Sequence, residues 1–208
     1  MSIVFAAIAP HGDMDLDAGL RAAMEELGRR FEAAAPDVAV VVTPHSIHVD
    51  GHFAVVTAGR VGEWETDREL AAALLAATPL PMLGVSYGGN DPASAEFPLD
   101  WGTEVPLAFM PSKRVLVISP ARDRPLEEHL RLGEAIAALP GRVALISSAD
   151  HGHAHDLDGP YGFDPAAAAY DARLQEILAS NRLDFFPLAD LVEVYGMLVA
   201  EVRGQTAA

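Results

Sequence analysis

The sequence contains no cysteine among its 208 residues. This absence excludes disulfide bonds, thiolate metal sites and a cysteine nucleophile, and it fits the cytoplasmic location that we expect. Basic residues are scarce too, because 14 Lys and Arg stand against 30 Asp and Glu, for a formal net charge of −16. Binding to nucleic acid or to an anionic membrane needs clustered Lys and Arg. We therefore expect neither nucleic acid nor membrane as a partner.

Long hydrophobic runs are missing as well. No stretch reaches the ~18 uninterrupted apolar residues that a membrane helix needs. The apolar N-terminus lacks the basic segment that opens a signal peptide, so we expect it to form a buried first strand. Half of the residues are hydrophobic. A chain of this length and composition fits one domain, over residues 1–208, with a single core.

Apolar runs alternate with helical stripes along the chain. The predicted strands are residues 3–8, 38–42, 53–57, 82–86, 115–119 and 143–147, and the predicted helices are residues 15–34, 67–77, 125–139, 164–178 and 187–202. The strands are short and rich in β-branched residues, which is typical of strands buried on both faces. The alternation predicts an α/β fold, namely a three-layer sandwich around a mostly parallel central sheet.

Histidines cluster directly after three of the predicted strands. These clustered residues are His11, then His45, His48 and His52, then His151, His153 and His155. The remaining one, His129, lies between acidic neighbours in a predicted helix, and we expect it at the surface. Because the carboxyl ends of parallel strands lie along one edge of a sheet, where ligand sites form, we expect the three segments to converge there.

A histidine cluster of this kind predicts a metal site. Neutral imidazole is the commonest metal ligand in proteins, and without cysteine the remaining ligands are expected to be carboxylates. An open site of two His and one carboxylate suits non-haem Fe(II) that activates O2. Zinc uses the same ligand types, so these residues leave the metal undecided.

Three segments resemble the class III, LigB-type, extradiol ring-cleaving dioxygenases. Residues 9–12 (APHG) and 40–45 (VVVTPH) resemble the two metal-ligand loops of this family, which implies His11 and His45 as ligands. Residues 148–153 (SADHGH) resemble the segment that ends in the family's catalytic acid/base, which implies that role for His153. The family fold that the resemblance implies agrees with the predicted α/β sandwich.

The resemblance departs from the family pattern at two places. Residues 98–107 (PLDWGTEVPL) are similar to a family segment in which Trp101 stands where a pocket His is usual, so an apolar wall replaces a hydrogen-bond donor. For the third metal ligand the best match is Glu193, with Asp190 and Glu201 as competitors. The remaining residues that we expect to line the substrate pocket are His48, Asp150, His151 and Tyr161.

The resemblance implies a non-haem Fe(II)-dependent extradiol dioxygenase that cleaves a catechol- or aminophenol-type aromatic with O2. Mn(II) and Zn(II) are the alternative metals. It also implies a homo-oligomer, in some relatives with a small second subunit. One alternative is a MEMO-like non-catalytic protein of the same fold that binds a metal or ligand. A zinc hydrolase is less favoured, because no general-base Glu is evident beside the ligands.

Overall fold

The computed structural model describes residues 3–15, 18–88, 90–149 and 151–180. Contacts divide the chain into two compact units, Met1–Ala149 and Asp150–Ala208. The elements of the first unit are β1 (Ile3–Ala9), α1 (Ala18–Ala34), β2 (Val38–Val42), β3 (Phe53–Val56), β4 (Arg60–Val61), β5 (Trp64–Thr66), α2 (Arg68–Ala77), β6 (Met82–Val85), the 3₁₀ turn η1 (Pro92–Ser94), β7 (Glu96–Phe97), α3 (Trp101–Phe109), β8 (Arg114–Ser119), α4 (Leu126–Ala137) and β9 (Val143–Ser148). The second unit contains α5 (Pro165–Ser180). The predicted helix 187–202 lies outside the described residues, and the single domain stays a prediction.

The described strands form one sheet in the order β1-β9-β2-β8-β5-β4-β7, with β3 paired to β8 and β6 paired to β3. All pairings are parallel except those of β3 with β8 and of β4 with β5. The central strands β2, β8 and β9 are β-branched runs that are almost entirely buried, as expected where helices cover both faces of a parallel sheet. The predicted mostly parallel sheet is therefore confirmed.

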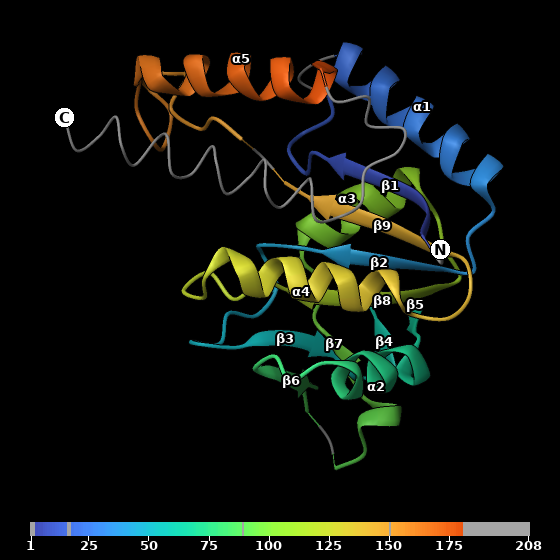
Figure 1. The fold of residues 1–208 in the computed structure, drawn as a ribbon. Helices are drawn as coiled ribbons and strands as arrows, with labels where there is room; N and C mark the ends of the chain where they lie inside the picture. The colour runs from blue at the N-terminus through green and yellow to red at the C-terminus, as the bar shows by residue number, and fades with distance from the viewer. Residues whose placement is uncertain (1–2, 16–17, 89, 150, 181–208) are drawn as a thin grey trace. The chain divides into compact units, whose positions relative to one another are not determined.

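Helices cover this sheet in two layers (Figure 1). Helix α1 packs on β1 and on α3, and α3 packs on β9, whereas α2 contacts α4 and β8. Met24 and Phe31 from α1 and Leu107 from α3 share one hydrophobic cluster with alternate residues of the central strands, such as Val41 and Val117. Successive strand residues point to opposite faces, so the remaining strand residues face the other helical layer. The predicted three-layer α/β sandwich is confirmed.

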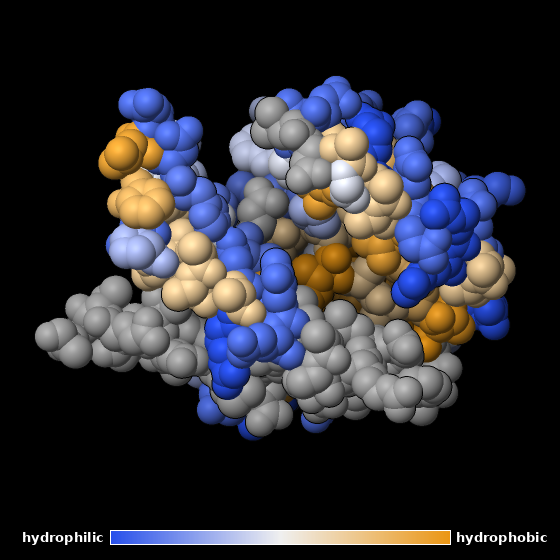
Figure 2. Space-filling view, turned by 90° about the horizontal axis from the view of Figure 1, so that it is seen from above, coloured by the Kyte–Doolittle hydropathy of each residue, from blue (hydrophilic) through white to orange (hydrophobic). Residues whose placement is uncertain are grey.

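Besides the 3₁₀ turn η1, four elements were not predicted from the sequence. They are the short strands β4, β5 and β7 and the helix α3. Among the described residues, no helix has the length and apolar character that crossing a lipid bilayer requires. Charged and polar residues cover much of the surface seen in Figure 2, and strongly hydrophobic residues show there only in small areas.

Candidate metal centre

Three neighbouring parallel strands end together at one edge of the sheet (Figure 1). Strand β9 lies between β1 and β2, with Ala9 opposite Ser148 and Val42 opposite Ser147. His11 follows β1 after one proline, and His45 follows β2 after a Thr-Pro turn. The strand order thus brings two histidines that are 34 positions apart to the same edge.

The two imidazole rings meet through their Nε2 atoms. His11 Nε2 and His45 Nε2 are 2.8 Å apart, and the ring centroids are 4.5 Å apart with the planes at 82°. His11 is buried, with 4% of its surface exposed, whereas His45 is half-buried. As predicted for the metal-ligand segments, the structure brings these two side chains together.

Ser148 fixes the orientation of the buried His11 ring. Its Oγ, at the end of β9, lies 2.9 Å from His11 Nδ1. A neutral imidazole carries one N–H and one lone pair. When Nδ1 carries the proton and donates to Ser148, the Nε2 lone pair of His11 points toward His45. A hydrogen-bonded second nitrogen of this kind is usual for metal-binding histidines.

The turn that carries His45 is held by a partly buried polar cluster at the start of α3. Asp100 caps this helix, since its Oδ1 accepts from the Thr103 backbone N–H at 3.1 Å and from the Thr43 hydroxyl at 2.7 Å. Thr43 Oγ1 in turn accepts from the His45 backbone N–H at 3.2 Å. At Gly102 a Cβ would lie 2.4 Å from Thr43 Oγ1 and 3.2 Å from Ser148 Oγ. A glycine is therefore needed for α3 to approach the edge so closely.

Trp101 lies over the His45 ring. The ring centroids are 4.5 Å apart, with the planes tilted by 37°, and Trp101 is 56% exposed. This exposure excludes core packing. The indole instead forms an open aromatic surface beside a candidate metal ligand, as a pocket wall would.

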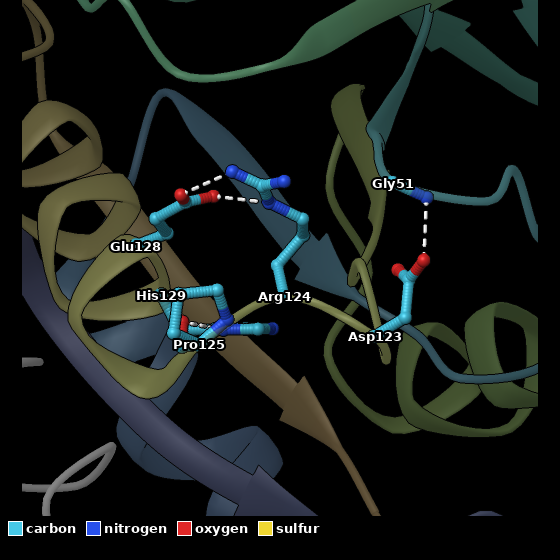
Figure 3. A network of polar contacts seen from close by, with 6 residues as sticks. All are labelled: Gly51, Asp123, Arg124, Pro125, Glu128 and His129. Carbon is cyan, nitrogen blue, oxygen red and sulfur yellow. Dashed lines mark hydrogen bonds and ion pairs between the residues drawn. The ribbon is translucent and has the colours of Figure 1, made fainter.

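The loop after β8 braces the loop that carries His45. The Arg122 guanidinium donates to the Pro44 carbonyl, and the Asp123 carboxylate accepts from the Gly51 N–H at 2.8 Å (Figure 3). These contacts hold both ends of the segment between Pro44 and Gly51. The predicted pocket residue His48 lies within this segment, is exposed, and pairs with Asp50 at 3.0 Å.

The donor set at this edge fits a divalent metal ion. Two nitrogens that each bind one metal ion at about 2.1 Å lie about 3 Å apart when the angle between the two bonds is about 90°. The Nε2 atoms of His11 and His45 are 2.8 Å apart, which is close to this value. A third ligand completes such a site, but no group of three His or carboxylate side chains able to hold a metal occurs among the described residues. The predicted third ligand Glu193, like its competitors Asp190 and Glu201, lies outside them.

In the second unit, the predicted acid/base is an exposed residue in an irregular segment. His153 Nδ1 lies 2.7 Å from the His151 carbonyl oxygen, and the His153 and Tyr161 rings meet edge to face at 5.1 Å. The His151 ring lies 6.2 Å from that of Tyr170. Asp150, also predicted to line the pocket, lies outside the described residues. The convergence of His153 with the first unit's histidines stays a prediction.

Several contributors to the site were missed at the level of sequence. Thr43 and Ser148 stand at the ends of β-branched runs, and each uses its hydroxyl to hold a candidate ligand segment. A hydroxyl residue immediately after a predicted strand, two or three positions before a histidine, is a signal that could have identified both. Arg122 carries no such signal, because its partner Pro44 is 78 positions away.

Comparison with known proteins gives one family match. The chain matches, over residues 1–197, the family model described as the catalytic LigB subunit of aromatic ring-opening dioxygenase. It is also similar to the crystal structure of the uncharacterized protein JW3007 from Escherichia coli K12, with 18% identity over 85% of this chain and 80% of that chain and a TM-score of 0.46. No curated protein matches the chain.

Proposed function

Because the chain belongs to the family of the catalytic LigB subunit of aromatic ring-opening dioxygenases, we propose that it is a non-haem Fe(II)-dependent extradiol dioxygenase. Its substrate is a catechol- or aminophenol-type aromatic, and O2 is the second substrate. The observation that carries the proposal is the His11–His45 pair, with facing Nε2 atoms 2.8 Å apart at the carboxyl edge of the sheet.

In this proposal His11, His45 and Glu193 would hold the metal, with Mn(II) or Zn(II) as the alternatives to Fe(II). When bound, Fe(II) supplies Lewis acidity and open positions for the ring heteroatoms and O2. Ser148 keeps the His11 ring oriented, and the Asp100–Thr43 contact fixes the backbone before His45.

His153 would act as the acid/base of the reaction. If its Nδ1–H donates to the His151 carbonyl, the Nε2 lone pair remains free to accept a proton from a ring hydroxyl. The proton is returned later to an oxygen of the opened ring. General acid–base help of this kind is worth about 10²–10⁴-fold in rate. The ring opens beside the diol and both atoms of O2 enter the semialdehyde-type product.

We propose that the substrate pocket is lined by Trp101, His48, His151, Tyr161 and Asp150. Trp101 offers an exposed aromatic face beside His45, and aromatic pairs are worth about 0.5–1.5 kcal/mol beyond the area that they bury. Stacking on the Trp101 indole would therefore favour a flat aromatic substrate. We further propose that the protein is cytoplasmic and forms a homo-oligomer. A small second subunit is a candidate partner of this assembly.

One observation favours a second function. Trp101 occupies a position where the resembling family segment has a histidine, so a hydrogen-bond donor to an oxygenated ring is replaced by an indole. A MEMO-like protein, which binds a metal or ligand without turnover, is therefore the second candidate.

Turnover assays on the metal-loaded protein separate these functions. The protein is purified anaerobically, its metal is measured by elemental analysis, and Fe(II) is added with a panel of catechols and aminophenols. Oxygen uptake coupled to a yellow ring-opened product supports the dioxygenase. Metal binding without oxygen uptake for any member of the panel refutes it and favours the MEMO-like function.

Histidine variants assign the roles. Replacing either His11 or His45 by alanine should abolish stoichiometric metal binding, whereas His153→Ala should bind metal normally and turn over about 10²–10⁴-fold more slowly. His129→Ala is the matched control, since this helical histidine contacts the Pro125 carbonyl and the Phe53 ring. Full activity of the His153 variant would remove the acid/base assignment.

A further inference from the structure

A single carboxylate in the second unit contacts the chain on both sides of His153. Asp171 Oδ1 accepts from the Gly152 backbone N–H at 2.8 Å, and Asp171 Oδ2 lies 2.8 Å from His155 Nε2. Asp171 belongs to α5, 16 positions after His155. His153, the first of the two residues between these partners, is exposed. One side chain thus spans the segment that presents the proposed acid/base.

The packing around Gly152 leaves no space for a side chain. A Cβ at this position would lie 2.7 Å from His155 Nε2, 2.8 Å from Asp171 Oδ2 and 2.9 Å from the Ala167 carbonyl oxygen. Two of these atoms belong to α5 and the third to the paired imidazole. Glycine is therefore required for the segment 152–155 to lie against α5.

The same segment is also held by the strand-like stretch that precedes α5. His155 pairs with Phe163 in an antiparallel bridge, and the Asp164 N–H donates to the Ala154 carbonyl at 2.8 Å. The backbone is thus fixed at residues 152, 154 and 155, immediately before and after His153. The His153 imidazole itself contacts the His151 carbonyl through Nδ1 and meets the Tyr161 ring edge to face.

We propose that Asp171 is a positioning residue that holds His153 in the orientation required for proton transfer. The inference rests on the proposed acid/base role of His153. Asp171 acts through the segment 152–155 and not on substrate or metal. A misplacement of about 1 Å in a catalytic group can cost about 10²-fold in rate. Loss of the carboxylate should therefore lower kcat and leave KM and metal binding unchanged.

Two variants remove this contact in different ways. Asp171→Ala deletes both hydrogen bonds, and Gly152→Ala forces the segment away from α5 without changing a titratable group. Glu176→Gln is the matched control, because Glu176 is an exposed carboxylate on the same helix that accepts from Arg173 at 3.1 Å. We expect kcat to fall about 10–100-fold in the first two variants, with KM within about twofold of wild type. Glu176→Gln should behave like wild type.

A double variant separates positioning from a general structural role. If Asp171 acts through His153, then Asp171→Ala should cost nothing further in a His153→Ala background, because coupled residues are not additive. Fe(II) stoichiometry should be unchanged in every variant, and hydrogen exchange at the Gly152 amide should accelerate in Asp171→Ala. A rate loss that persists in the His153→Ala background, or a loss of metal, would overturn the inference.

The two proposals fail in different ways. If His153→Ala is slow while Asp171→Ala keeps full kcat, only the positioning role is wrong. If wild type shows no ring cleavage, or His153→Ala keeps full activity, the acid/base role itself fails and the positioning role falls with it.

Discussion

Replacing Ser148 by alanine tests how the candidate metal centre holds its buried ligand. The Ser148 hydroxyl lies 2.9 Å from His11 Nδ1, and the two residues are 3% and 4% exposed. Removing the hydroxyl takes a hydrogen-bond partner from a buried imidazole, which costs about 1–3 kcal/mol. For a chain of this length, that loss lowers the melting temperature by roughly 2–12 °C. Thermal unfolding of the metal-free protein measures it.

Metal affinity should fall in the same variant. Loss of a group that orients a ligand histidine typically weakens metal binding about 10–100-fold, and anaerobic Fe(II) titration measures this. Ser147→Ala is the matched control, because adjacent strand residues point to opposite faces, and Ser148→Thr should retain most of the affinity because it keeps the hydroxyl. The reasoning is refuted if Ser148→Ala binds Fe(II) as tightly as wild type, or if Ser147→Ala loses as much.

Three further predictions concern packing, pH and the metal. Gly102→Ala should lower the free energy of unfolding by about 1–3 kcal/mol through overpacking against Thr43, as measured by denaturant titration. Gly12→Ala, which has no atom within 4 Å of the new Cβ, should stay within about 0.5 kcal/mol of wild type; equal losses in both would contradict the steric argument. The Arg124 guanidinium beside Glu128 holds the pKa of that carboxyl below its ordinary value. The ion pair therefore stabilises the fold above the unfolded-state pKa of about 4.3, and this stability is lost as the pH falls through the folded-state pKa. Glu128→Gln should accordingly have a lower melting temperature than wild type near neutral pH and the same melting temperature in strong acid. A difference that persists in acid would be evidence against the ion pair. Chelation of a bound metal should lower the melting temperature, because a ligand present at about 100 times its Kd stabilises a protein by about 2.7 kcal/mol; no shift in metal-loaded protein would contradict coupling of the site to folding.

The sequence predicts the ends of the main strands well because each is a β-branched run closed by a polar turn. Residues 38–42, 115–119 and 143–147 correspond to β2, β8 and β9, with differences of at most one residue at each end. The order of the strands in the sheet could not be predicted in this way, because it depends on contacts between distant segments. The insertion of the late strand β9 between β1 and β2 places Ser148 beside His11, and no local pattern reports it.

Short and irregular elements escaped prediction for identifiable reasons. Strands β4, β5 and β7 have two or three residues each, too few to show a period of two. Helix α3 contains Pro106, which normally interrupts a helix. The contacts of Asp171 join residues 16 and 19 positions apart, so neither helical nor strand spacing reveals them.

Locating the bound metal ion tests the assignment of His11 and His45 as the metal centre most directly. Crystals of the protein loaded anaerobically with Fe(II), with diffraction recorded at the iron absorption edge, would locate the ion. We predict an anomalous peak about 2.1 Å from Nε2 of both His11 and His45, the usual distance between an imidazole nitrogen and a divalent metal. Iron bound elsewhere, or to only one of the two rings, would contradict the assignment of this pair as the metal centre.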